Sequence, residues 1–370
     1  MRTTSVRMAA LAAGAWLAAL NAQAGATIPF GEDKSLSVGF GMRASYANIE
    51  HGAADGSHAN DFNLDSARLF LGASLNKNIK GMLNTEWDGS RIRILDAAGQ
   101  FAISPELNIW AGRMLSPSDR ANMAGPYYSL GGGYWAGVAS RYGYNGGIFR
   151  GRDDGVTVWG NVAGGKLGYS FGAFEGHTFG IGALTQDEAR AAGIRSADKP
   201  MLAGRLQYDF WDAEPGYYGT GTYLGSKDIL AIGLAGRQQK EGVLTAARLG
   251  DYRSWNVDFL LEKRLAGGTA ASVEAAYYDY DTGDVILSEQ GKAWSAGAAY
   301  IFPIQHGSLQ PYLRFQKFDA DTGIATRQQD VGVNWVLDGY NAQIGATYSR
   351  TKITGTDDQS KLVVALQLQY

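Results

Sequence analysis

The sequence predicts an all-β protein, a transmembrane antiparallel β-barrel of sixteen strands with one long loop folded into it. Three observations predict this fold. The chain begins with an export signal, and it then alternates apolar and polar residues over segments as long as a membrane-crossing strand. Its last segment alternates in the same way and ends in an aromatic residue, Tyr370.

The export signal occupies residues 1–24. Arg2 and Arg7 give a positively charged start, residues 8–20 form a short apolar stretch, and the sequence AQA at 22–24 is typical of a cleavage site. The apolar stretch is shorter than the roughly 20 residues that a membrane-spanning helix needs. We therefore expect a cleaved signal peptide at 1–24 and a single barrel domain at 25–370, located in the bacterial outer membrane.

The composition favours strands and excludes two classes of function. The chain has 51 Gly, 20 Tyr, 14 Phe and 9 Trp, a mixture that suits strands and turns better than helices. It has no cysteine, which excludes disulfides and thiol chemistry. Without Arg2 and Arg7, 31 of the 33 basic residues remain against 36 acidic ones, so the formal charge is −5. A nucleic-acid partner would need a basic surface and is not expected.

The alternation has a period of two residues, as in a strand with one face in lipid and one in water. In residues 35–46, apolar side chains from Leu36 to Tyr46 share one face, while Ser37, Arg43 and Ser45 share the other. A tilted strand needs about 10 residues to cross a bilayer, and this segment is long enough. The same pattern recurs at 156–162, 202–210, 255–262, 340–349 and 361–370. Aromatic residues near the ends of such segments would lie in the two membrane interfaces.

The strand number follows from the turns. Both ends of such a barrel lie in the periplasm, so the number is even. Short turns at 76–78, 104–106 and 163–165 alternate with long loops after Ile49, Leu115 and Gly176. Segment 217–227 can be a strand or part of a long periplasmic turn that begins at 212–216. Taking it as a turn gives sixteen strands, which we expect, and eighteen is the alternative.

The longest gap between alternating segments runs from 115 to 152, and a loop of this length is usually functional. We expect it to fold into the barrel as a constriction. Its charged residues, with the arginine just before it, are Arg113, Asp119, Arg120, Arg141, Arg150 and Arg152, a net charge of +4. Arginine suits carboxylate and phosphate oxygens, and charge in a narrow pore acts strongly on passing ions. An equally weighted reading is that these arginines pair with acids of the barrel wall. Arg113 shares the parity of the lipid-facing residues, so a bulge or an early exit from the sheet would be needed to bring it inside.

The barrel wall is balanced in charge. The basic residues at lumen-facing positions are Arg43, Arg68, Arg205, Arg237, Arg314 and Lys361, and the acidic ones are Glu86, Asp96, Asp209, Asp258, Glu262 and Glu274. A neutral wall leaves the loop to decide any preference among ions. We therefore expect a weak preference for anions.

Several stretches resemble the phosphate-selective porin O and P family and its broader relatives. These stretches are ARLFL at 67–71, LDAAGQF at 95–101, WAGR at 110–113, PSDRAN at 117–122, GPYY at 125–128, FWD at 210–212, EPGYY at 214–218, KDILAIG at 227–233 and DFLLEK at 258–263. The resemblance implies a sixteen-stranded homotrimeric porin that passes small hydrophilic solutes, phosphate or other small anions among them. It also makes Arg120 the arginine expected to matter most.

Two other readings of the function remain open. A barrel whose lumen is plugged would serve a structural or adhesive role, and a secreted β-sandwich lectin would show shorter stretches of the same alternation. We find no constellation of catalytic or metal-binding residues among the four histidines and the acids, so no enzyme, cofactor or metal is expected. Besides its solutes, the expected partners are outer-membrane lipid and lipopolysaccharide.

Overall fold

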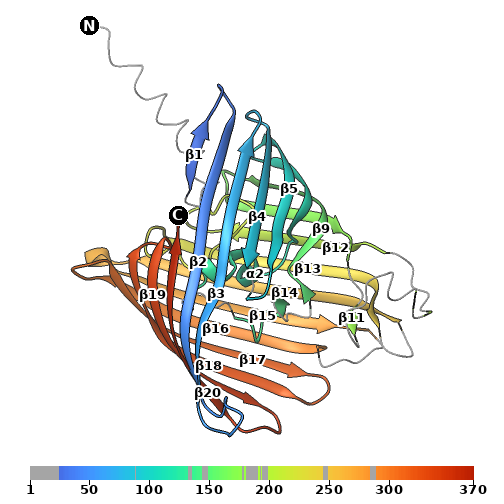
Figure 1. The fold of residues 1–370 in the computed structure, drawn as a ribbon. Helices are drawn as coiled ribbons and strands as arrows, with labels where there is room; N and C mark the ends of the chain where they lie inside the picture. The colour runs from blue at the N-terminus through green and yellow to red at the C-terminus, as the bar shows by residue number, and fades with distance from the viewer. Residues whose placement is uncertain are drawn as a thin grey trace.

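A closed ring of sixteen antiparallel strands forms the molecule in the computed structural model (Figure 1). The structure describes residues 25–370 except 88, 132–135, 144–148, 177–178, 181–190, 192, 194–198, 245–248 and 284–288, so the expected signal peptide at 1–24 lies outside the described residues. The strands of the ring are β2 (Ser35–Ile49), β3 (Ala59–Ser74), β4 (Ile79–Trp87), β5 (Ile92–Ser104), β6 (Leu107–Leu115), β9 (Arg152–Val162), β10 (Leu167–Phe174), β12 (Met201–Asp209), β13 (Ile229–Leu244), β14 (Leu249–Arg264), β15 (Ala270–Asp281), β16 (Gly291–Pro303), β17 (Ser308–Ala320), β18 (Ala325–Asp338), β19 (Ala342–Ile353) and β20 (Gln359–Gln369).

The ring closes between its first and last strands. β20 pairs with β2 from Gly41 opposite Gln369 to Ile49 opposite Lys361. The short strand β1 (Ala26–Pro29) pairs with the start of β2, just before the stretch of β2 that pairs with β20. Three further short strands, β7 (Tyr142–Gly143), β8 (Phe149–Arg150) and β11 (Phe179–Gly180), lie in the long connections. The predicted fold is confirmed, with sixteen strands in the closed ring.

Alternation along each strand separates an apolar outer face from a polar inner face. In β17, Leu313 is 43% exposed on the outside, whereas the neighbouring Arg314 is 3% exposed on the inside. Lipid can accept an apolar outer surface, and a closed ring leaves no unpaired edge inside the membrane. In the part of the chain that is described, no helix is both long and apolar enough to span a membrane.

The connections differ at the two ends of the barrel. The end that holds Tyr370 has the short turns that the sequence predicts, at 75–78, 105–106 and 163–166, and the opposite end has the long loops. Residues 210–228 join β12 to β13 at the Tyr370 end. The ambiguous segment 217–227 is therefore part of a connection, as expected, and forms no strand of the ring.

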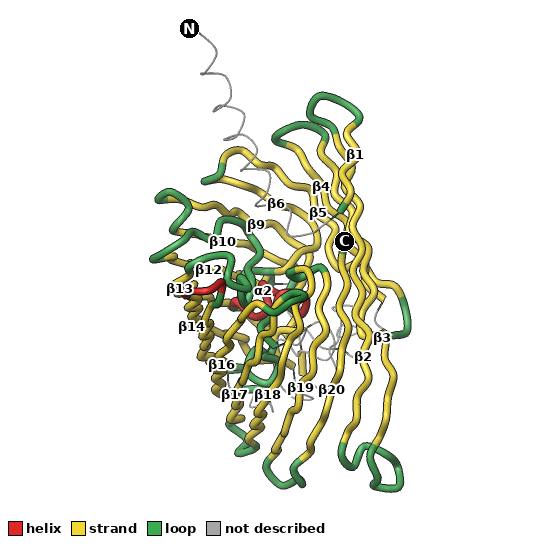
Figure 2. The backbone as a smooth tube through the Cα atoms, turned by 90° about the vertical axis from the view of Figure 1, so that its left-hand side faces the viewer, coloured by secondary structure: helices red, strands yellow, loops and turns green. Residues whose placement is uncertain are grey.

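Two connections enter the barrel from opposite ends. The constriction loop, residues 116–151, carries the short helix α2 (Arg120–Ala124) and the 3-10 turn η2 (Pro126–Tyr128) (Figure 2). The inner connection, residues 210–228, reaches it inside the barrel. The backbone N–H of Gly221 donates to the carbonyl of Tyr128 at 2.8 Å, and that of Gly219 to Met123 at 3.4 Å. The sequence predicts the first of these inward segments, but it gives no sign that the second enters the lumen.

Gly112 lets β6 lie close to β5 just before the constriction loop begins. Its φ is +126°, and a Cβ atom there would lie 2.2 Å from the carbonyl oxygen of Ala97. We expect Gly112→Ala to lower the free energy of unfolding by about 1–3 kcal/mol, because it adds strain and a clash. Loss of heat-resistant migration on gels and urea unfolding in detergent measure this. Gly99→Ala is the matched control, since nothing lies within 4 Å of its added Cβ. Equal stability of the two variants would contradict the expectation.

Candidate functional site

The centre of the site is Arg120, at the first position of α2. Its guanidinium donates two hydrogen bonds to the carboxylate of Glu214, each 2.7 Å long, and a third to the carbonyl of Thr220 at 2.9 Å. The Arg120 side chain is 5% exposed and that of Glu214 4%. Glu214 belongs to the inner connection, so this two-pronged ion pair joins the two inward segments. Burial disfavours the charge on Arg120, but attraction by Glu214 outweighs it and raises the pKa of the guanidinium.

Asp258, on β14, ties the constriction loop to the barrel wall. It accepts a hydrogen bond from the backbone N–H of Arg120 at 3.1 Å. Both terminal nitrogens of Arg205, on β12, also donate to its carboxylate. Arg205 in turn donates to the carbonyl of Ser118 at 3.0 Å. Two buried arginines thus share one buried carboxylate, which fixes the beginning of α2.

Asp119 precedes α2 and is fully buried. Its carboxylate accepts a hydrogen bond from the hydroxyl of Tyr278 at 2.8 Å. Burial, with the nearby negative charge of Asp258, raises the pKa of Asp119 to about 6. The charge of the loop therefore changes within a physiological pH range.

Glu262, on β14, holds the inner connection. Its carboxylate accepts hydrogen bonds from the hydroxyl of Thr222 at 2.7 Å and from the backbone N–H groups of Tyr223 at 2.9 Å and Gly225 at 2.6 Å. At the other end of the segment, the hydroxyl of Tyr217 donates to the carbonyl of Leu115 at 2.6 Å. The inner connection is therefore anchored to the wall and to the start of the constriction loop.

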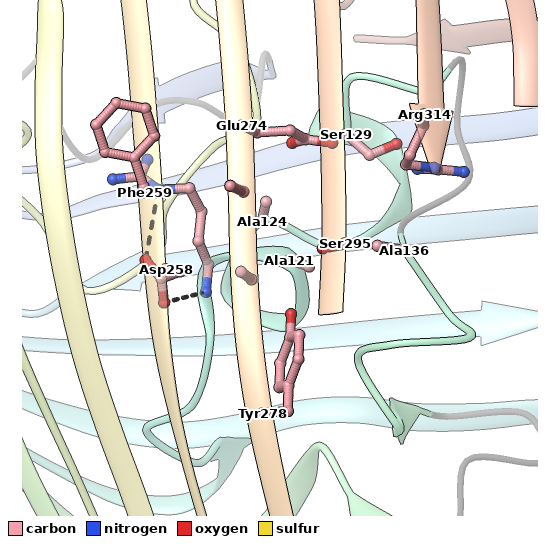
Figure 3. A pocket seen from close by; sticks show the side chains of 14 residues that line it. Ala121, Ala124, Ser129, Ala136, Asp258, Phe259, Glu274, Tyr278, Ser295 and Arg314 are labelled. Carbon is pink, nitrogen blue, oxygen red and sulfur yellow. Dashed lines mark hydrogen bonds and ion pairs between the residues drawn. The ribbon is translucent and has the colours of Figure 1, made fainter. Parts of the chain in front are cut away.

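Two cavities lie beside Arg120, which lines both of them. One is lined by Asp258, Glu274, Tyr278 and Arg314, among others (Figure 3). The second lies against Glu214 and the aromatic side chains of Trp159, Tyr217 and Tyr218. Charged side chains line these spaces together with apolar and aromatic groups.

The other loop arginines have separate surroundings. Arg152 forms an ion pair with Asp96 at 2.9 Å, inside the barrel. Arg141 lies over the ring of Phe318 at 4.1 Å, and its Nε is buried without a hydrogen-bond acceptor among the described residues. The side chain of Arg150 lies outside the described part of the structure. Arg120, Arg141 and Arg152 are thus all brought inside the barrel.

Arg113 does not belong to the constriction, which corrects the sequence-based assignment. The ladder between β6 and β9 continues without a bulge from Asn108 to Leu115, so Arg113 keeps the parity of the outer face. Its guanidinium forms two hydrogen bonds of 2.7 Å to Asp154, and both side chains are exposed. The pair Arg113–Asp154 therefore lies on the outside of the barrel.

Most of the predicted lumen-lining residues point inward and form ion pairs, whereas Arg237 donates to the carbonyls of Ser116 and Pro117 in the constriction loop. Arg68 binds Glu86 at 2.8 Å and also lies over the ring of Tyr127, a constriction-loop residue, at 4.6 Å. Arg43 lies 3.8 Å from Asp65. Arg314 binds Asp330 at 3.0 Å. One of the two readings of the sequence was that the loop arginines pair with acids of the barrel wall. Arg152 does so with Asp96, whereas Arg120 pairs chiefly with Glu214 of the inner connection.

Glu214, Thr222 and Asp330 belong to the site but were missed. The stretch that contains Glu214 was noticed only as part of a resemblance and was assigned to a turn. Asp330 lies opposite Arg314 in the ladder between β17 and β18, so its partner could have been found once the strand register was known. Among the described residues, no group of three or more acidic or histidine side chains is arranged to hold a metal ion.

Comparison with known proteins places the fold. No family model matches the sequence, and no curated protein matches it. Among solved structures, Pseudomonas putida OprB matches with a TM-score of 0.63 at 10% identity, over 90% of this chain and 94% of OprB. The chain has a porin fold. The anion-selective porin of Comamonas acidovorans gives a TM-score of 0.57 at 13% identity, over 92% of this chain and all of the porin. The trimer form of OmpT from Vibrio cholerae gives 0.56 at 13% identity, over 92% of this chain and all of OmpT. Membership of the phosphate-selective porin family stays a prediction.

Proposed function

We propose that the protein is an outer-membrane channel through which small hydrophilic solutes diffuse passively, with a weak preference for anions such as phosphate. The observation that carries this proposal is the closed barrel with an apolar outer face, a polar inner face and a constriction loop inside it. Such a barrel crosses a membrane and offers water a path that lipid does not. The similarity to porins supports it through the fold alone.

The weak anion preference rests on the uneven charge of the constriction loop. Arg120 and Arg152 form ion pairs with Glu214 and Asp96. Arg141 stacks on Phe318 and forms no ion pair within 4 Å among the described residues, although Glu289 acts on its charge at longer range. We therefore assign the preference chiefly to Arg141, because Glu214 cancels the charge of Arg120. A homotrimer embedded in lipid and lipopolysaccharide is part of the same proposal, and the OmpT trimer supports it by analogy of fold.

Planar-bilayer recording tests the proposal. The purified protein is expected to insert with stepwise, ohmic increases in current. A correctly folded, heat-modifiable barrel that never carries current would refute the channel. Extraction only by detergent from the outer-membrane fraction is expected as well, and recovery in the soluble fraction would contradict a location in the membrane.

A plugged barrel is the second candidate function, and one observation favours it. The lumen-facing side chain of Glu262 is 0% exposed, and residues of the inner connection contact it. A plugged barrel would serve a structural or adhesive role, and the same recordings would then show no steps.

Replacing Arg141 by glutamine is expected to lower the anion-to-cation permeability ratio roughly twofold at 0.1 M salt, because it removes a charge inside the lumen. The effect should shrink at 1 M salt, where screening is strong. Arg113→Gln is the matched control, since Arg113 lies outside the barrel and should not alter the ratio. Reversal potentials across a KCl gradient measure both variants. Equal reversal potentials for the Arg141→Gln and Arg113→Gln variants would show that Arg141 does not contribute to ion selectivity.

A further inference from the structure

The inner connection is built to hold one carboxylate in the lumen. Its first half is fixed where the backbone N–H of Glu214 donates to Asp209 at 2.7 Å. Its second half is fixed by Glu262 through Thr222 and Tyr223. Glu214 therefore occupies a defined position inside the barrel, although it comes from a connection at the end opposite to the constriction loop.

Glu214 contacts Arg120, and both side chains are almost fully buried. Besides the two bonds from Arg120, its carboxylate accepts hydrogen bonds from the hydroxyl of Tyr223 at 2.8 Å and from the amide of Gln207 at 3.0 Å. Burial raises the pKa of Glu214, but the charge of Arg120 more than offsets this and lowers it, so the acid is ionised at neutral pH. Charge-assisted, two-pronged pairs of this kind are strong and geometrically specific.

The pair lies where it can act on ions in the lumen. Arg120 lines both cavities, and Glu214 lines the second. Other charges face Arg120 as well. Asp258 lies 3.8 Å from its Nε, but Arg205 already binds that carboxylate. Glu214 is therefore the acid that compensates Arg120 most directly.

We propose that Glu214 is a selectivity-determining residue of the channel, because it cancels the charge of Arg120 beside both cavities and so keeps the preference for anions weak. This inference rests on the proposed function. Under this inference, the inner connection at the Tyr370 end controls ion selectivity together with the constriction loop.

A charge-swap series tests the inference in planar bilayers at 0.1 M KCl. Glu214→Gln is expected to shift the permeability ratio toward anions by roughly threefold, because a lumenal positive charge loses its partner. Arg120→Gln is expected to shift the ratio toward cations by a similar factor, and the double variant is expected to return close to the parent. Glu106→Gln, an exposed acid in a turn at the same end, is the matched control and should leave the ratio unchanged.

Opposite shifts and a compensated double variant support the inference, since a purely structural role would move both single variants in the same direction. Shifts in one direction, or a Glu214→Gln variant with the parent's reversal potential, overturn it while leaving the channel intact. If Glu214→Gln does not assemble, Arg120→Gln decides alone by shifting toward cations or failing to. A parent protein that carries no current would instead refute the proposed function itself.

Discussion

Replacing Asp258 by alanine is expected to lower the free energy of unfolding by about 3–5 kcal/mol, because the change leaves buried positive charge without its partner. Arg205 would lose both of its hydrogen bonds to this carboxylate. The backbone N–H of Arg120 would lose its acceptor as well. Urea unfolding of the barrel in detergent, followed by tryptophan fluorescence, measures the decrease in the free energy of unfolding. A variant that fails to assemble would show that the decrease exceeds the stability of the barrel.

The control for this experiment is Asp61→Ala. Asp61 is exposed on β3, so its removal should change the free energy of unfolding by no more than about 0.5 kcal/mol. An Asp258→Ala barrel as stable as the Asp61→Ala barrel would show that Asp258 does not hold the constriction loop to the wall.

Asp119 is expected to contribute a fall in the free energy of unfolding as pH rises through the acidic range. In the folded protein the pKa of Asp119 is raised to about 6, chiefly by burial, so the fold holds its proton more tightly than the unfolded chain does. The unfolded carboxyl loses its proton near about pH 4. This contribution is fully present below about pH 4 and is lost between about pH 4 and 6. The difference of about two pH units corresponds to about 3 kcal/mol.

Asp119→Asn isolates this contribution. Asparagine keeps an oxygen that can accept the hydrogen bond from Tyr278 but does not ionise, so unfolding between pH 4 and 7 should lose that part of its pH dependence. Asp61→Asn should keep the slope of the parent. The same slope in Asp119→Asn and in the parent would mean that Asp119 is not the group that titrates.

The barrel could be predicted from the sequence because the membrane imposes a strict pattern. A strand with lipid on one side and water on the other must alternate apolar and polar residues. Residues 35–46 alternate in this way over the full width of a membrane. The even strand number then resolved the one ambiguous segment, 217–227. The direction in which that segment runs could not be predicted, because turn residues specify a reversal of the chain and not whether the turn folds outward or into the lumen.

The site could be predicted only in part. Charge and loop length were enough to identify the constriction loop and to point to Arg120. Its partners could not be found, because Glu214 and Asp258 lie 94 and 138 residues further along the chain. Arg113 was assigned to the constriction because it lies beside the loop in sequence, although its parity already placed it with the outward-facing residues. Arg113 pairs with Asp154 in the ladder between β6 and β9, so its parity predicted its position correctly and its closeness to the loop in sequence did not.

The reversal potential of the parent channel across a KCl gradient tests the central claim most directly. That claim is that the barrel conducts and that ion pairs neutralise most of its lumenal arginines. It predicts stepwise currents with a modest anion preference at 0.1 M salt that declines toward none at 1 M, as screening increases. Strong anion selectivity that persists at high salt would show that Arg120 and Arg152 act as unpaired charges, and would contradict the claim.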